Sequence, residues 1–403
     1  MPIVALLGTF DTKGHEYAFL CDRVREHGVE TLLIDAGINE PVGIDPDVSR
    51  FEVAAAGGAD VAQLADAGDR GAAVDAMARG AAVLVPRLHG KGCLDALVGL
   101  GGSGGSAIAT TAMRALPVGV PKLMVSTLAS GDTRPYVGAV DVTMMYSVVD
   151  ISGVNSISAR IMSNAAAAIA GMAGATLPHI EHRPLVGATM FGVTTPCVTR
   201  ARERLEELGY EVLVFHATGT GGQSMEALIA GGFLAGVLDV TTTELADELV
   251  GGVLSAGPER LEAAGRTGVP QVVSLGALDM VNFGPRETVP PQFERRNLYV
   301  HNPTVTLMRT TAEECGELGR TIGKKLTAAT GPVAVFVPLR GVSMIDVDGQ
   351  PFRDAEADEA LFGGLRDSLD SGIEVHELDL DVNDDRFADA MANRLHELIE
   401  AAR

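Results

Sequence analysis

Six small residues in the first third of the chain have the composition of an anion-binding loop. Residues 101–106 read Gly-Gly-Ser-Gly-Gly-Ser, directly after the apolar run 96–100 and before a helix predicted to begin near Ser106. Glycine lets a ligand approach the backbone, and a helix N-terminus offers N–H groups to phosphate or carboxylate. The alternative is a tight turn without a ligand, because the loop lacks a Walker A ending and is only a loose match to the dinucleotide fingerprint, whose glycines have fixed spacing.

A second polar segment follows the N-terminal strand. Residues 8–14 read Gly-Thr-Phe-Asp-Thr-Lys-Gly and are predicted to form a loop before the first helix. Lys13 would neutralise a phosphate, and Asp11 would bind a ribose hydroxyl or, through water, Mg²⁺. The alternatives are a solvated lysine and an aspartate that caps the helix. The predicted anion-binding cluster of the first half consists of Thr9, Asp11, Thr12, Lys13, Gly101–Ser106 and Ser130–Thr133.

The second half of the chain contains another glycine-rich loop and a histidine near an arginine pair. Residues 216–224 read His-Ala-Thr-Gly-Thr-Gly-Gly-Gln-Ser and precede a predicted helix. His301 is a candidate general acid or base for a small anionic substrate, with Arg340 as a second catalytic candidate. A loop histidine without a catalytic task is the alternative. The ligand candidates of this half are Thr194, Thr195, Gly219, Gly221, Gly222 and Ser224.

Other catalytic groups have little support. The cysteines form no CxxC motif and are predicted to be reduced thiols. Cys197 is the one candidate nucleophile, because a helix N-terminus beside it would lower its pKa. His179 and His182 have no clear third ligand, so no metal site is predicted.

Composition narrows the class of partner. The formal net charge of −22 opposes binding to a phosphate backbone, and aromatic residues make up only 4% of the chain, with no tryptophan. The N-terminus lacks the basic region of a signal peptide, and no apolar segment is convincing as a membrane span. We therefore expect a cytoplasmic protein that binds neither nucleic acid nor membranes.

Alternating apolar runs and helical segments predict the elements that position these residues. The N-terminal half reads as strand, helix, strand, which is the unit of a parallel sheet. After a linker predicted at 176–184 the pattern restarts. The fold class is therefore α/β, with two Rossmann-like domains at 1–178 and 184–403, mainly parallel sheets and helices on both faces. Polar loops repeatedly follow the strands, and ligands bind at that edge of such sheets.

Three segments together resemble a known family. They are Gly8–Gly14, the run 101–106, and Pro338-Leu-Arg-Gly-Val-Ser343. The chain resembles, from Ile3 to about Leu369, a bacterial and fungal family related to the tomato mosaic virus resistance protein and usually described by an ATP-binding domain. The resemblance implies two α/β domains, ATP bound by the first with or without Mg²⁺, and a homodimer, but no reaction. The nucleotide contacts it implies are Thr9, Phe10, Asp11, Thr12, Lys13, Gly102, Ser103, Gly104, Gly105, Ser106, Ser130, Gly131 and Asp132.

Three functions follow from these observations. The first is a nucleotide-binding metabolic enzyme whose second domain takes a small acidic metabolite. The second is a non-catalytic, nucleotide-responsive interaction or regulatory protein. The third is an ATP-independent enzyme centred on the C-terminal domain, with His301 and Arg340. Turnover separates the enzymes from the regulatory protein, so the sequence leaves open whether the chain is an enzyme.

Overall fold

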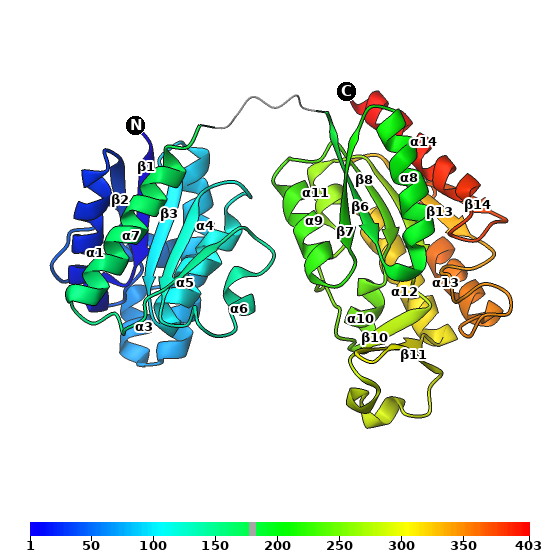
Figure 1. The fold of residues 1–403 in the computed structure, drawn as a ribbon, viewed down its shortest axis with the longest axis horizontal. Helices are drawn as coiled ribbons and strands as arrows, with labels where there is room; N and C mark the ends of the chain where they lie inside the picture. The colour runs from blue at the N-terminus through cyan, green and yellow to red at the C-terminus, as the bar shows by residue number, and fades with distance from the viewer. Residues whose placement is uncertain (177–182) are drawn as a thin grey trace. The chain divides into compact units, whose positions relative to one another are not determined.

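The computed structural model describes residues 1–176 and 183–403, which form two compact units. We call them the N-terminal and the C-terminal domain and describe each by itself (Figure 1). Most of the predicted linker, with His179 and His182, lies outside the described residues. Among the described residues, no helix combines the length and hydropathy that crossing a bilayer requires.

A five-stranded parallel sheet forms the centre of the N-terminal domain, in the order β2-β1-β3-β4-β5. Its strands are β1 (Ile3–Gly8), β2 (Glu30–Asp35), β3 (Ala96–Gly101), β4 (Lys122–Ser126) and β5 (Thr143–Tyr146). Strand β1 pairs with both β2 and β3, so the sheet grows in opposite directions from it. That point is the topological switch point, outside which doubly wound sheets bind their ligands.

Helices cover both faces of this sheet. On one face lie α1 (Phe10–Glu26) and α7 (Ser156–Ala173), and on the other α2 (Arg50–Ala56), α4 (Arg70–Gly90) and α5 (Ser103–Ala115). The short helices α3 (Val61–Ala67) and α6 (Arg134–Val137) pack at the periphery. Side chains of β1 alternate between the two cores: Val4 and Leu6 join the α1 side, Ala5 and Leu7 the α4 side. Both faces are buried, which is why the strands read as unbroken apolar runs.

The C-terminal domain has a six-stranded parallel sheet in the order β14-β13-β9-β8-β6-β7. The strands are β6 (Leu185–Met190), β7 (Glu211–His216), β8 (Gly236–Thr241), β9 (Gln271–Gly276), β13 (Val333–Pro338) and β14 (Glu374–Leu378). Here β6 pairs with both β7 and β8. Numbered within each domain, both sheets therefore have the order 2-1-3-4-5, and the second sheet adds a sixth strand.

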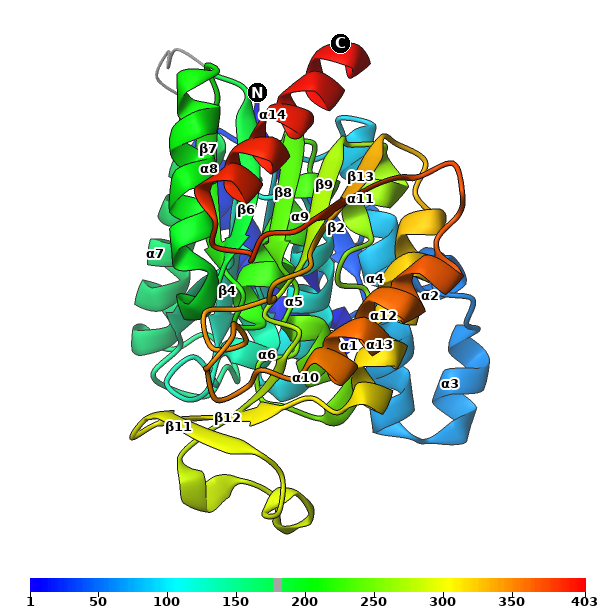
Figure 2. The same ribbon diagram turned by 90° about the vertical axis from the view of Figure 1, so that its right-hand side faces the viewer.

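Helices also cover both faces of the second sheet. Figure 2 shows α8 (Thr195–Glu207) and α14 (Asp385–Ala402) across one face. The other face is covered by α9 (Thr220–Ala230), α10 (Glu244–Val250), α11 (Ala263–Thr267) and α12 (Ala312–Thr327), and α13 (Ala355–Ser368) packs on α12. A small antiparallel sheet, β10-β12-β11, adds β10 (Met280–Phe283), β11 (Leu298–Asn302) and β12 (Val305–Arg309). The predicted fold class is confirmed, whereas this antiparallel sheet was not predicted.

Candidate functional site

A cavity of about 370 Å³ lies at the switch point of the N-terminal sheet. Ligand-binding clefts have volumes of roughly 300–1,000 Å³, so the cavity has the size of a small-molecule site. Its wall combines Thr9 and the first turn of α1, the segment after β2, and the N-terminal halves of α4 and α5. The lining residues are Thr9, Asp11, Thr12, Ala36, Gly37, Ile38, Asn39, Gly68, Asp69, Arg70, Ala73, Val74, Met77, Gly104, Gly105 and Ile108.

The N-terminus of α5 differs from the other two helix N-termini at the cavity. In α4 the Asp69 carboxylate caps the helix by accepting from Ala72 N at 3.0 Å. At the start of α1, the amide of Phe10 donates to Asp35 Oδ1 at 3.1 Å. The N-cap of α5 is Gly102, and within the described residues no side chain caps it. The first-turn amides of α5 therefore have no side-chain acceptor, and they carry the positive end of the helix dipole.

Arg70 supplies a positive charge next to this helix start. Its side chain is exposed and forms no ion pair or hydrogen bond within the part of the chain that the structure describes. A Cβ placed on Gly104 would lie 3.9 Å from Arg70 Nη2, so the guanidinium sits against the first turn of α5. An uncapped helix N-terminus beside an unpaired guanidinium is an arrangement that binds phosphate.

Two aspartates hold the segments around the cavity in place. Asp11 Oδ2 accepts from the amides of Ile38 at 3.2 Å and Asn39 at 3.1 Å, while its buried Oδ1 has no partner among the described residues. Asp35 Oδ1 accepts from Gly37 N at 2.8 Å as well as from Phe10 N. Burial raises the pKa of Asp35, although these backbone donors oppose the shift. Asp11 and Asp35 thus join the segment after β2 to the start of α1.

The cavity contains some of the predicted nucleotide contacts but not others. Thr9, Asp11, Thr12, Gly104 and Gly105 line it. Helix α1 begins at Phe10, inside the loop predicted at 8–14, so most of that expected loop is the first turn of a helix that is kinked at Lys13.

The remaining predicted contacts of the first half do not line this cavity. Phe10 is fully buried, Lys13 Nζ donates to the carbonyl of Ile151, and Ser106 Oγ lies 2.7 Å from Ser126 Oγ. Asp132 forms a surface ion pair. The others outside the lining are Gly102, Ser103, Ser130 and Gly131.

Helix α4 contributes residues to the cavity that the sequence did not predict. Arg70, Val74 and Met77 line the cavity from this helix, and Asn39 lines it from the segment after β2. The available signal was Asp69 followed by a helical pattern, which marks a capped helix start. Nothing local in the sequence indicates that this start faces residues 101–105.

Charged and hydroxyl side chains fill the corresponding edge of the C-terminal sheet. Arg260 is buried and pairs with both oxygens of Asp239, at 2.5 and 2.7 Å. Its Nε donates to Glu244 Oε2 at 2.7 Å. Between β6 and β8, Thr189 Oγ1 donates to Asp239 at 2.7 Å and Thr194 Oγ1 lies 2.8 Å from Thr241 Oγ1.

The glycine-rich loop 216–224 lies next to this network, and its amides already have an acceptor. Gly219 N and Gly222 N donate to Glu244 Oε1 at 2.7 and 3.1 Å. The hydroxyls of Thr195 and Ser224 donate to backbone carbonyls. A Cβ on Gly221 would fall 1.7 Å from the His216 carbonyl, so packing alone requires glycine there.

The two catalytic candidates and Cys197 occupy different surroundings. His301 is exposed on β11. Arg340 is exposed after β13 and pairs with Asp379, at 3.0 Å between Nη2 and Oδ2. No hydrogen bond joins His301 to Arg340 in the described structure. Burial raises the pKa of Cys197 instead of lowering it, so the predicted activation of this thiol is wrong.

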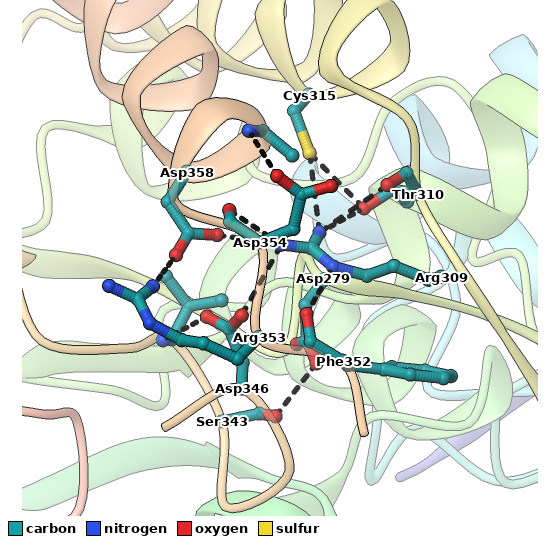
Figure 3. Close-up of polar contacts among 12 residues, drawn as sticks. Asp279, Arg309, Thr310, Cys315, Ser343, Asp346, Phe352, Arg353, Asp354 and Asp358 are labelled. Carbon is teal, nitrogen blue, oxygen red and sulfur yellow. Dashed lines mark hydrogen bonds and ion pairs between the residues drawn. The ribbon is translucent and has the colours of Figure 1, made fainter. Parts of the chain in front are cut away.

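A second buried charge cluster links the antiparallel sheet to α13 (Figure 3). Arg309 Nη2 lies 2.7 Å from Asp358 Oδ1 and 3.3 Å from Asp346 Oδ1. Ser343 Oγ donates to Asp279 Oδ2 at 2.8 Å. Burial raises the pKa of all three carboxyl groups, with Arg309 opposing the shift. The cluster fixes the loop after β13 against β12 and α13.

Family models match both domains. The N-terminal domain of an uncharacterised protein family (UPF0261) matches residues 2–178, and the C-terminal domain of the same family matches residues 183–399. A solved UDP-N-acetylglucosamine 2-epimerase from Rickettsia bellii aligns over 68% of this chain and 78% of its own. That alignment has 9% identity and a TM-score of 0.23.

Two relatives show how far the similarity extends. A UPF0261 protein of Clostridium tetani is 54% identical over 399 residues, covering 98% of this chain and 99% of that protein. The tomato (Solanum lycopersicum) ToMV resistance protein Tm-1(GCR237) is 40% identical over 427 residues, covering 100% of this chain and 56% of that protein. The predicted relationship to the tomato protein is confirmed, whereas ATP binding stays a prediction. The chain belongs to the UPF0261 family.

Proposed function

We propose that the N-terminal domain binds a nucleotide, ATP, in the cavity at its switch point. The observation that carries the proposal is the uncapped N-terminus of α5 beside Arg70, at the edge where this strand order places ligands. A phosphate there would accept hydrogen bonds from the first-turn amides and from the guanidinium, both of which favour an anion.

The rest of the cavity suits the other parts of a nucleotide. Val74, Met77 and Ile108 give an apolar wall for a base. Asp11 and Asn39 provide polar groups that fit a ribose. Asp11 and Asp69 are the carboxylates that would hold a phosphate-bound Mg²⁺ through water, and the ion would supply charge neutralisation.

Calorimetric titration of the full chain with ATP, with and without Mg²⁺, tests the proposal. We expect saturable binding of ATP and much weaker binding of adenosine, because the phosphate contacts carry the charge. Lys13→Ala provides a contrast, since Lys13 donates to the Ile151 carbonyl and does not line the cavity. Its ATP affinity should stay within about twofold of wild type. Failure of the wild-type chain to bind ATP at millimolar concentration would overturn the proposal.

We propose as a second function that the nucleotide regulates a non-catalytic homodimer. The supporting observation is that the amides predicted to hold an acidic metabolite already donate to Glu244. Light scattering with and without ATP, beside a turnover assay on a panel of small carboxylates and phosphates, separates the two functions. A nucleotide-dependent mass without turnover supports regulation, and turnover supports a metabolic enzyme with its substrate bound elsewhere.

A further inference from the structure

The glycine-rich loop of the C-terminal domain has the geometry of an occupied oxoanion site. Gly219 is the N-cap of α9 and Gly222 lies in its first turn. Their amides converge on a single oxygen, Oε1 of Glu244, at 2.7 and 3.1 Å. Arg260 Nε binds the second oxygen at 2.7 Å. One carboxylate thus receives two backbone donors at a helix N-terminus and one guanidinium donor, as a bound oxoanion would.

The carboxylate explains why position 222 of this loop is a glycine. A Cβ on Gly222 would fall 2.2 Å from Glu244 Oε2, so only glycine lets the carboxylate approach. Gly219 has φ +84°, a conformation that side chains rarely adopt. Gly222 is thereby accounted for by a ligand that the chain itself supplies, and Gly219 by its backbone conformation.

The charge balance of this buried site depends on the Glu244 side chain. Glu244 and Arg260 are fully buried, and Arg260 also pairs with Asp239 and, at 3.4 Å, with Glu226. Glu226 is engaged by the backbone, because its two oxygens accept from Leu261 N and Ala263 N at 2.7 Å. Removing the Glu244 carboxylate therefore leaves two amides and one guanidinium N–H without their acceptor in a buried site.

We propose that Gly219, Gly222 and Arg260 form a carboxylate-binding site whose resident ligand is Glu244. A small carboxylate from solution, formate or acetate, takes the same position when the side chain is shortened. This inference is independent of nucleotide binding by the N-terminal domain. In the intact chain the site is closed to external anions by its own glutamate.

Chemical rescue of Glu244→Ala tests the site. The variant should unfold at lower temperature than wild type, and acetate should restore most of that loss with a saturable dependence, measured against chloride at equal ionic strength. Glu244→Gln is the matched control, because the amide keeps the size of the side chain and leaves no room for acetate. Neither Glu244→Gln nor wild type should gain stability from acetate beyond the effect of chloride.

A second measurement covers a variant that fails to fold in chloride. Glu244→Ala is then refolded from urea with and without formate or acetate, and folding only in the presence of the carboxylate supports the site. Loss of stability without saturable recovery in any of these anions would overturn the proposal. Equal recovery in wild type, Glu244→Gln and Glu244→Ala would do so too, because it would be a general salt effect.

Discussion

The two sheets have the same strand order but opposite contents at their carboxyl edges. At the N-terminal switch point lie a cavity, the start of α5 and Arg70, and no side chain among the described residues caps this helix or pairs with this guanidinium. In the C-terminal domain, Arg260, Asp239 and Glu244 satisfy one another in the corresponding region. Strand order therefore determines where a ligand would bind, and side chains decide whether that place is a site or part of the core.

Comparing the two glycine-rich loops by their place in the fold refines this contrast. Residues 101–106 follow the third strand of their domain, whereas 216–224 follow the second. The counterpart of 101–106 in the C-terminal sheet is Thr241–Glu244, which is buried. The two glycine-rich loops therefore follow different strands of their sheets. Within the C-terminal domain, Glu244 lies after the third strand and binds the loop that follows the second strand.

The largest expected effect comes from removing Arg260, the buried cation at the carboxyl edge of the C-terminal sheet. Arg260→Leu leaves Asp239 and Glu244 buried without their positive partner, which should destabilise the C-terminal domain by about 3–5 kcal/mol. Arg266→Ala is the control, since that exposed arginine should contribute about 0–1 kcal/mol. Urea unfolding measures both, and equal losses would show that the buried network does not support this domain.

In the N-terminal cavity, Arg70→Ala should weaken ATP binding about tenfold, or about 1.4 kcal/mol, because a charge-assisted contact to phosphate is lost. Arg79→Ala, on the same helix, removes an exposed arginine that is already paired with Asp75 and should leave affinity unchanged. Calorimetry compares the two. If both variants lose the same affinity, the effect is a general charge effect and Arg70 has no specific role.

The stability of the C-terminal domain should also depend on pH. Burial raises the pKa of Asp247 to about 7, against the hydrogen bonds donated by Asn282. The folded state therefore holds a proton that the unfolded state releases near pH 4, so stability falls as pH rises from about 4 to about 7. Asp247→Asn should reduce this slope by up to about 1.4 kcal/mol per pH unit. Exposed Asp75→Asn should not, and a slope unchanged by Asp247→Asn would contradict the assignment.

The smallest expected effect separates ATP affinity from thermal stability at the N-terminal cavity. Gly104→Ala places a methyl group in the cavity wall, 3.4 Å from Val74 Cγ2, an ordinary contact distance. Alanine favours the helix over glycine by up to about 1 kcal/mol, so thermal stability should hold or rise. ATP affinity should fall roughly fivefold, since the methyl group narrows the approach to the α5 amides. A fall in both quantities would mean that the change disturbs the fold instead of the site.

Sequence periodicity was sufficient for the two parallel sheets because their strands are apolar on both faces. It did not predict the sheet β10-β12-β11, whose strand β11 is largely exposed and has only the short apolar run Leu298–Val300. It also placed the start of the first helix too late, because the polar residues after Gly8 resemble a loop although Thr9 accepts the first helical bonds from Thr12 and Lys13.

The candidate site was less predictable because its parts are distant in sequence. The glycines of 101–106 and the threonines after β1 were identified from composition. Arg70 was not, because its role depends on how α4 packs against α5. The sequence also did not indicate that amides of the loop 216–224 already have an acceptor. Only the structure shows that Gly219 N and Gly222 N donate to Glu244.

The pairing of β1 with β3 also sets the order in which the N-terminal domain matures on the ribosome. Val4 pairs with Ala96, and Gly104 and Ile108 follow only later in the chain. At roughly 5–20 residues per second, synthesis runs for several seconds before the cavity wall is complete. A ligand there cannot assist the early nascent chain. A nucleotide bound as proposed would stabilise the finished domain by mass action, so cellular nucleotide levels would influence how long the protein survives rather than whether it folds.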